Sequence, residues 1–310
     1  MQDKRVIFMG TPEFALPIVN CLYESVNLIG IISQPNKEVG RKKIIVDTPT
    51  AAFAKEKGIH LMQPIKVREI TEEIKELNPD MIVTCAYGQI VPEEILNIPK
   101  YGCINVHGSL LPKYRGGAPI QRAIMNGEEK TGITIMYMDK GMDTGDMIKK
   151  EEVEIEETDN LETLSNKLSL CGEKLLREVL PTIFAGTNER IKQNDDEATL
   201  APIIKKADEL IDFNQTKEEV FNKIRGLSPV PAGYFMMDDK RVKVYESYKK
   251  DEQVKEPSII SNIYSDGFAI STTNGEIVIT KLQVEGKKPS SGKDYLNGVK
   301  KESLLNKRIN

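Results

Sequence analysis

The sequence predicts an α/β protein with a doubly wound, mostly parallel sheet, followed by a smaller C-terminal domain of the β-barrel type. Short apolar runs bounded by turn residues alternate with segments of helical spacing in the first half, as in parallel sheets covered by helices on both faces. Closely spaced β-like runs dominate the last third and indicate a small barrel or sandwich. A length of 310 residues is sufficient for two such domains.

The first domain is expected to span residues 1–188. Its strands are short, partly β-branched runs, and its helices show apolar residues three or four positions apart or carry helix start signals. The expected strands are 5–9, 27–33, 80–86, 102–106 and 132–138, and the expected helices are 12–25, 48–58, 67–77, 118–127 and 160–186. Ligands of such sheets bind beyond the carboxyl ends of the strands, so the loops that follow strands carry the candidate site.

Residues 189–206 are polar and weakly periodic, which indicates a linker. The second domain is expected to span residues 207–310 and to begin with a helix. That helix covers 216–227, and the strands after it are expected at 241–247, 257–264, 267–273 and 276–284.

Composition limits the possible partners. The formal net charge is −4, so a nucleic acid would have to bind a local basic patch. The four cysteines are widely spaced without a CxxC pair, which predicts reduced thiols and no metal site. No apolar run approaches the roughly 18 residues of a membrane helix, and the N-terminus lacks the apolar core of a signal peptide. We therefore expect a cytoplasmic protein that does not bind a membrane.

His107 is one of only two histidines, and it lies two positions after Asn105 at the carboxyl end of an expected strand. Side chains two positions apart on a strand point to the same face. An amide N–H can stabilise a developing oxyanion, and an imidazole can move a proton near neutral pH. The pair therefore predicts attack on a carbonyl carbon, whereas His60 has no such neighbours and is expected to be structural.

The loop MDKGMDTGDM at 138–147 follows the next expected strand and can supply a carboxylate to His107. Asp139, Asp143 and Asp146 are the candidates. Turn formation is the alternative for all three, and it is the favoured interpretation of Asp139 and Asp146 taken singly. The single DTG does not predict an aspartic protease, which needs two such carboxylates. The stretch GTPEFA after the first strand lacks the further glycines of a dinucleotide-binding loop.

The run NVHGSLLPKYRGGAPIQRAIMNGEEKTGITIMYMDKGMDTGDM closely resembles the signature region of enzymes that transfer a formyl group from 10-formyltetrahydrofolate. The stretches VIFMGTPEFALPIV, AYGQIVPEEIL, IRGLSPVPAGYF and LQVEGKKPS also resemble that family, so the resemblance spans nearly the whole chain. It implies a Rossmann-like catalytic domain that holds the folate and a C-terminal domain similar to an OB barrel. Within the family, the match is closest to the members that formylate the α-amine of initiator methionyl-tRNA.

On this resemblance, Asn105, His107 and Asp143 correspond to the family's catalytic residues. Asn105 would stabilise charge on the formyl oxygen, His107 would take the amine proton, and Asp143 would orient the imidazole. The folate contacts are expected from two stretches, namely Ser109, Leu110, Leu111 and Pro112, and Tyr87, Gly88 and Ile90. No metal is required.

The resemblance also implies a surface for tRNA. Arg41, Lys42 and Lys43 form a charge run that would otherwise be interpreted as a solvated face, but the family uses a basic loop here to contact the acceptor end. Lys287 and Lys288, with Lys205 and Lys206, are expected to contact phosphates. Two departures concern tRNA docking: GRKK lacks a glycine that the family often has after the arginine, and Val230 stands where a tryptophan is common. We expect a monomer.

Three other functions compete with this hypothesis. An amino-sugar nucleotide N-formyltransferase would share the catalytic trio and the folate site, but it would need a nucleotide site and no basic loop. Glycinamide ribonucleotide formyltransferase is a single domain with a glycine-rich phosphate loop after its first strand, which is absent here. An RNA-binding module on a degenerate catalytic domain would be expected to lose the trio, and all three residues are present.

Overall fold

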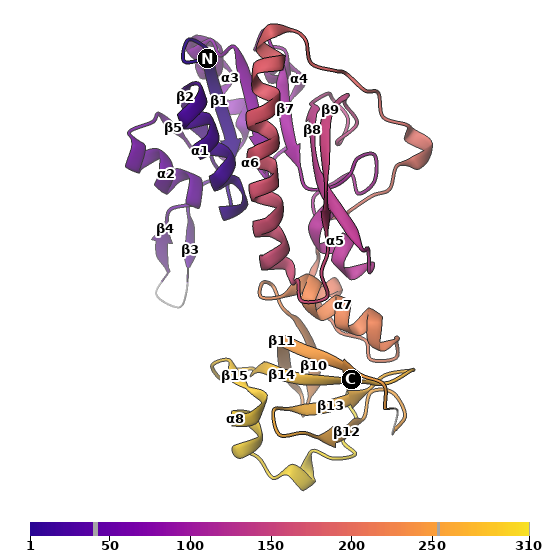
Figure 1. Ribbon diagram of the computed structural model, residues 1–310. Coiled ribbons are helices and arrows are strands. Elements are labelled where there is room, and N and C mark those ends of the chain that lie inside the picture. Colours follow the sequence, from indigo (N-terminus) through magenta and orange to yellow (C-terminus); the bar gives the residue numbers. More distant parts are fainter. Residues whose placement is uncertain (40–42, 253–254, 310) are drawn as a thin grey trace. The chain divides into compact units, whose positions relative to one another are not determined.

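The computed structural model describes residues 1–39, 43–252 and 255–309. The chain divides into two compact units (Figure 1). Unit 1 comprises Met1–Pro119, Lys130–Glu154 and Ser165–Pro202, and unit 2 comprises Ile120–Glu129, Ile155–Leu164 and Ile203–Asn310. Most of the expected linker, up to Pro202, therefore packs with unit 1.

The sheet of unit 1 has the strand order β5-β2-β1-β6-β7-β8-β9. The first five of these strands are parallel, and β8 and β9 continue the sheet in antiparallel fashion. Strand order reverses at the central β1, as in a doubly wound sheet, so the predicted fold class is confirmed. The strands are β1 (Arg5–Gly10), β2 (Asn27–Ile32), β5 (Leu61–Met62), β6 (Met81–Cys85), β7 (Cys103–His107), β8 (Lys130–Tyr137) and β9 (Met147–Glu154).

The five strands predicted for the first domain are all present, with ends that differ by at most two residues. The short β5, the edge strand β9 and a separate two-stranded hairpin were not predicted. This hairpin is formed by β3 (Lys37–Val39) and β4 (Ile44–Val46), and it follows β2.

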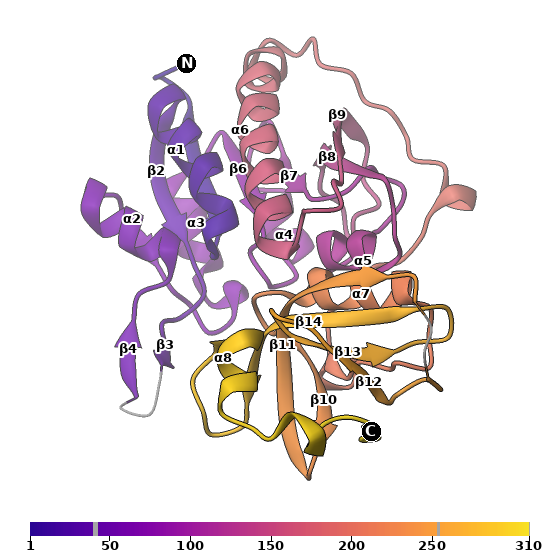
Figure 2. The ribbon, with the colours of Figure 1, turned by 60° about the horizontal axis from the view of Figure 1, so that its bottom comes forward.

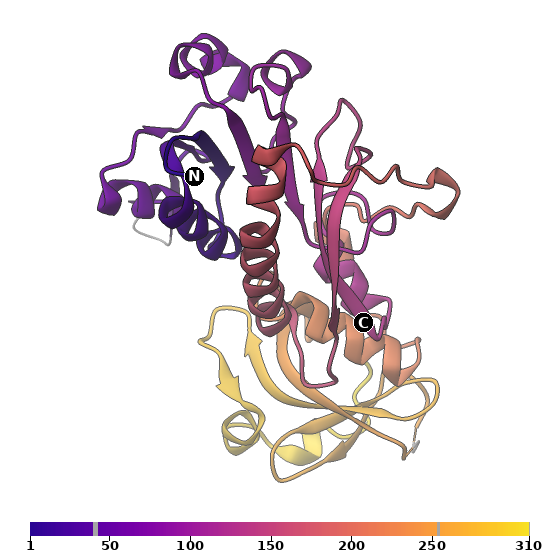
Figure 3. The same cartoon turned by 45° about the horizontal axis from the view of Figure 1, so that its top comes forward.

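Helices cover both faces of this sheet. One face carries α1 (Leu16–Ser25) and α6 (Leu161–Ala185), which lie side by side in Figures 1 and 3. A Cβ at Gly172 of α6 would lie 2.9 Å from Val106 of β7 and 3.2 Å from Ile18 of α1. A side chain at position 172 would have to displace Val106, so glycine allows α6 to pack closely on β7.

The other face packs on α3 (Thr71–Leu77) and α4 (Glu93–Leu96) through one apolar cluster. The remaining helices of the first half are α2 (Pro49–Lys57) and α5 (Pro119–Met125). The 3₁₀ helices are η1 (Glu13–Ala15), η2 (Val67–Ile70), η3 (Asp195–Glu197), η4 (Lys206–Glu209) and η5 (Lys301–Ser303). The predicted long helix 160–186 is observed as α6.

Unit 2 contains an antiparallel sheet with the strand order β10-β11-β14-β13-β12, seen from another side in Figure 2. The additional strand β15 pairs with β14. The helix α7 begins with a capping box, in which Thr216 and Glu219 satisfy each other's backbone N–H groups. The elements are α7 (Lys217–Leu227), β10 (Gly233–Met237), β11 (Lys240–Lys250), β12 (Ile260–Ile263), β13 (Phe268–Ser271), β14 (Glu276–Val284), β15 (Ser290–Ser291) and α8 (Gly292–Asn297).

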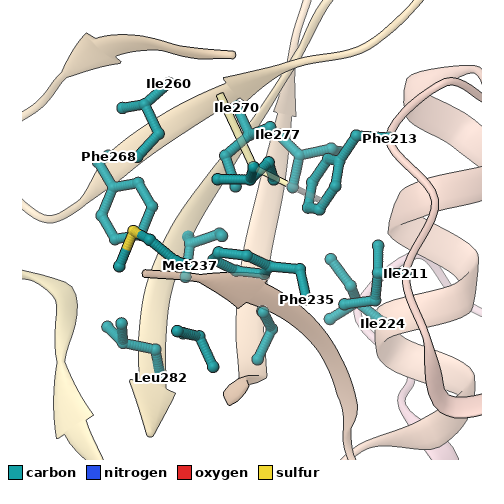
Figure 4. Close-up of a cluster of buried hydrophobic side chains, with 14 of the residues drawn as sticks. Ile211, Phe213, Ile224, Phe235, Met237, Ile260, Phe268, Ile270, Ile277 and Leu282 are labelled. Atoms are coloured by element: carbon teal, nitrogen blue, oxygen red, sulfur yellow. The ribbon is translucent and has the colours of Figure 1, made fainter. Parts of the chain in front are cut away.

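The core of unit 2 lies between this sheet and the helices α7 and α8, and Figure 4 shows 14 of its side chains. Phe235 of β10 is fully buried there, and its ring meets Phe213 edge to face at 5.7 Å. Alternate residues of a strand face opposite sides, so the neighbouring Tyr234 points away from this core.

Replacing Phe235 by alanine is expected to lower the free energy of unfolding by about 3–5 kcal/mol, because it removes buried apolar contacts and leaves a cavity. The measurement is urea unfolding followed by circular dichroism, with Tyr234→Ala as the matched control. Equal losses in the two variants would contradict the burial pattern of β10.

Candidate functional site

Asn105 and His107 lie at the carboxyl end of β7, between β6 and β8. Asn105 is aligned with Thr84 of β6, and His107 with Thr134 of β8. The His107 side chain is 6% exposed, and Asn105 is half-buried. Both residues are therefore at the edge of the sheet where open α/β folds bind ligands.

Asn105 is oriented by a residue that the sequence did not single out. The Thr84 hydroxyl donates a hydrogen bond of 2.9 Å to the Asn105 side-chain oxygen. Because the oxygen already accepts from Thr84, the side-chain nitrogen is the atom left to donate to a ligand. Asn105 thus offers a hydrogen-bond donor at the end of β7.

The imidazole of His107 has a defined tautomer. Its Nε2 lies 3.0 Å from the backbone oxygen of Tyr114. A carbonyl oxygen only accepts hydrogen bonds, so Nε2 must carry a proton. In the neutral ring the lone pair is then on Nδ1, which lies 3.7 Å from Oδ2 of Asp143. Nδ1 is therefore the nitrogen that can take up a proton, beside a carboxylate that stabilises the resulting charge.

The structure brings Asp143 to His107 and uses Asp139 in a turn. Oδ2 of Asp143 accepts a hydrogen bond of 2.8 Å from the Gly116 N–H. Oδ1 of Asp139 instead accepts from the Gly141 N–H and the Thr144 hydroxyl. Local geometry thus distinguishes Asp143 from Asp139, and the turn expected at Asp139 is observed.

The stretch Ser109–Pro112 is held from within the protein. Thr134 donates to the Ser109 carbonyl at 2.7 Å and accepts from the Leu111 N–H at 3.1 Å. The Leu111 side chain packs with Met136 and Met147, and Pro112 is buried as well. Leu110 is half-buried. A ligand at this stretch would therefore meet backbone atoms and Leu110 rather than Leu111.

The second expected folate stretch follows β6, the strand next to β7. Tyr87 is 4% exposed and belongs to the apolar cluster under α3 and α4, where burial raises the pKa of its hydroxyl to about 12. The phenol is thus neutral at physiological pH. Gly88 is exposed and Ile90 is 91% exposed. Gly88 and Ile90 are accessible to a ligand, whereas the Tyr87 ring packs in the hydrophobic core.

The basic residues lie in two separate regions of the chain. Arg41 and Lys42 fall outside the described residues. Lys43 is exposed beside β4 and forms an ion pair of 3.4 Å with Glu38 of β3. Four further lysines, all in unit 2, are exposed too, namely Lys205, Lys206, Lys287 and Lys288.

Two further residues at the site were not predicted, Arg115 and Gln193. The Gln193 side-chain nitrogen donates 2.8 Å hydrogen bonds to the backbone oxygens of Asp143 and Gly145. Arg115 Nε donates to the Gln193 side-chain oxygen at 3.0 Å. Gln193 comes from the polar segment that was expected to be a linker, where no sequence pattern marks it.

His60 differs from His107 in its surroundings. Half of its side chain is exposed, and its Nε2 pairs with Glu73 at 2.8 Å. Within residues 1–39, 43–252 and 255–309, no three His, Cys, Asp or Glu side chains form a group that could hold a metal ion. Over the same part of the chain, no helix is long and apolar enough to cross a membrane.

Comparisons with known proteins agree over nearly the whole chain. Residues 4–180 match the model of the formyl transferase family, and residues 203–300 match the model of the formyl transferase C-terminal domain. A methionyl-tRNA formyltransferase of Bacillus subtilis is 46% identical over 305 residues, which are 96% of each chain. One of Bacillus cereus is 48% identical over 303 residues, again 96% of each chain.

A solved structure has a related fold. It is the N-formyltransferase of Helicobacter canadensis in complex with folinic acid and dTDP-3-aminofucose, with a TM-score of 0.68 and 22% identity over 89% of this chain and 98% of that one. This likeness concerns the fold. The matched family models and the relatives at 46% and 48% identity show that the chain belongs to the formyl transferase family.

Proposed function

We propose that the protein transfers the formyl group of 10-formyltetrahydrofolate to the α-amine of initiator methionyl-tRNA, producing N-formylmethionyl-tRNA for translation initiation. Relatives named for this activity share 46% and 48% of their residues with the chain over nearly its full length. The structural observation that carries the proposal is the pair formed by His107 Nδ1 and Asp143 at 3.7 Å, beside Asn105 at the end of β7.

The chemistry follows from these three side chains. The α-amino group of an aminoacyl ester titrates close to neutral pH, so an uncharged, nucleophilic fraction of the amine is present there. The Asn105 side-chain nitrogen donates to the formyl oxygen as negative charge develops there. His107 Nδ1 accepts the proton that the attacking amine loses and returns one to the departing folate nitrogen. Asp143 balances the charge of the imidazolium, so no covalent enzyme intermediate is needed.

The folate would occupy the edge of the sheet beyond β6 and β7. The accessible groups there fit a flat, partly polar ring: Gly88 exposes backbone, and Ile90 and Leu110 offer apolar surface. The side chains of Tyr87 and Leu111 are buried, so they would support the binding site without contacting the folate directly. This binding site would present the formyl carbon to the His107–Asp143 pair.

The acceptor decides between this proposal and its alternative, an amino-sugar nucleotide N-formyltransferase. The direct experiment supplies 10-formyltetrahydrofolate with either methionyl-initiator-tRNA or a dTDP-linked amino sugar, and measures formylated product by mass spectrometry. We expect product only with the tRNA. Formylation of the sugar alone would overturn the proposal.

The hairpin β3–β4 is proposed to bind the acceptor end of the tRNA through Arg41, Lys42 and Lys43. Replacing all three by alanine is expected to raise the KM for tRNA and to flatten its dependence on salt concentration, because each lost phosphate contact lowers the salt slope by about 1. The KM is measured over a series of salt concentrations.

The matched control is the double variant Lys4→Ala, Lys100→Ala. Both lysines lie before the amino ends of strands, at the edge of the sheet opposite the loops that follow β6 and β7. Charge removal there should leave the salt slope unchanged. The same slope for the wild type and the hairpin variant would contradict a contact between the hairpin and tRNA.

We further propose that the protein acts as a monomer in the cytoplasm, where initiator tRNA is charged and used. Its four cysteines are free, which suits a reducing compartment. Light scattering should give a mass close to 34.8 kDa, and a dimer mass would contradict the proposed monomer.

A further inference from the structure

Gln193 is a buried amide in an otherwise exposed polar segment. Lys192 and Asn194 on either side are exposed, whereas Gln193 is 5% exposed. A buried amide is costly unless its polar atoms are hydrogen-bonded. Both donors and the acceptor of Gln193 are used, and the donors go to the backbone of the loop that carries Asp143.

Arg115 holds Gln193 from the opposite side. Its guanidinium is 8% exposed, and it donates from Nε to Gln193 and from Nη2 to Asp195 at 2.8 Å. A guanidinium offers several donors in a fixed plane, so it can bridge two acceptors with a defined spacing. Gln193 is therefore confined between a buried cation and the Asp143 loop.

The same segment also supports the loop on the other side of the site. The Arg115 N–H donates to the Thr199 carbonyl at 2.8 Å, and the Ala201 N–H donates to the Arg115 carbonyl at 2.7 Å. Gly116 has a φ of +123°, and a Cβ there would lie 2.7 Å from the Ala201 oxygen. This close contact requires glycine and sets the position of the Gly116 N–H.

The two supports converge on one pair of side chains. The Gly116 N–H binds the carboxylate of Asp143, and the carbonyl of Tyr114, two residues earlier, binds Nε2 of His107. Asp143 itself has a φ of +55°, in the left-handed region that non-glycine residues seldom occupy without support. The donors of Gln193 act on its carbonyl and on that of Gly145.

We propose that Gln193, held by Arg115, is a positioning residue that keeps the Asp143 carboxylate beside Nδ1 of His107. The inference rests on the proposed function, because it assigns Gln193 a role in the same reaction. It makes the segment before unit 2 part of the catalytic apparatus, although Gln193 does not touch the reacting atoms.

The central variant is Gln193→Met, which keeps the length of the side chain and removes its hydrogen bonds. We expect kcat to fall by about 100-fold, as for a catalytic group displaced by about 1 Å, while the KM values for folate and tRNA stay unchanged. Lys192→Met is the matched control, since it makes the same replacement at the exposed neighbour, and it should leave kcat unchanged. A wild-type kcat in folded Gln193→Met overturns the proposal.

A second variant guards against misfolding. Gln193→Glu retains an acceptor for Arg115 but cannot donate to the Asp143 and Gly145 carbonyls. It should lose as much kcat as Gln193→Met while remaining folded, as judged by its thermal melting temperature. Wild-type turnover in this variant would show that the donors of Gln193 have no role.

A double-mutant cycle separates positioning from general structural support. If Gln193 acts only through Asp143, then Gln193→Met should cause no further loss of kcat in a chain that already carries Asp143→Asn. A structural role would lower kcat by the same factor in both backgrounds, and that result would overturn the proposal.

Failure of the proposed function would look different. In that case wild-type protein would not formylate methionyl-tRNA at all, and the crystal structure of Gln193→Met would remain as the test. We expect the Asp143 carboxylate to leave the Gly116 N–H in that structure. A carboxylate that keeps its 2.8 Å contact would overturn the positioning role independently of any activity.

Discussion

Replacing His107 by alanine is expected to lower kcat for formyl transfer by about 10²–10⁴-fold, the usual contribution of a general acid–base group. The loss follows from the geometry at Nδ1, which faces Asp143 and is the only ring nitrogen free to accept a proton, because Nε2 donates to Tyr114. The measurement is single-turnover formylation of methionyl-tRNA, which isolates the chemical step from product release.

Two further variants make this prediction specific. His107→Gln can keep a donor near the Tyr114 carbonyl but cannot take up a proton, so it should be as inactive as the alanine variant. His60→Ala removes the other histidine, which is half exposed and paired only with Glu73 among the contacts described, and it should retain activity. Near-normal kcat in both His107 variants would remove this residue from the mechanism.

Replacing Asn105 by alanine is expected to lower kcat by about 10²–10³-fold, as for the loss of one donor to a developing oxyanion. The donor is needed as charge builds on the formyl oxygen, so folate affinity should change much less than kcat. Steady-state rates and equilibrium folate binding, measured by fluorescence or calorimetry, separate the two effects.

Thr84 provides the companion experiment for Asn105. Thr84→Val keeps the volume and shape of the side chain but removes the hydroxyl that donates to the Asn105 oxygen. The Asn105 amide is then free to rotate, and we expect a smaller loss of kcat than in Asn105→Ala. Thr84→Ser retains the hydroxyl and should restore turnover. A larger loss in Thr84→Val than in Asn105→Ala would contradict an orienting role.

Most of the first sheet could be predicted from the sequence because its central strands are buried on both faces. Such strands are largely apolar runs, and β1 and β6 have this composition. The edge strand β9 reads MIKKEEVE and has no apolar run. This segment becomes a strand because it pairs with β8, and the local sequence pattern of β9 does not reveal that pairing.

The candidate site shows the same division. Asn105 and His107 are two positions apart on a strand, so the period of the strand alone predicts that they share a face. Choosing Asp143 over Asp139 requires the path of the loop, because both aspartates follow β8 and only one meets the Gly116 N–H. The resemblance to a known family already pointed to Asp143 as the catalytic carboxylate, and the loop geometry supplies the physical reason.

The sequence by itself therefore determined the features that depend on residues a few positions apart. These are the strand and helix periods, the Asn105–His107 pair and the family motifs around that pair. Only the tertiary structure decided the tautomer of His107, the orientation of Asn105 and the burial of Gln193. Each of these depends on a hydrogen bond to a residue on another segment, and Gln193 lies 50 positions from Asp143 and 78 from Arg115. Contacts of that separation form only when the chain has folded, so an exposed polar residue and a buried positioning residue look alike in the sequence.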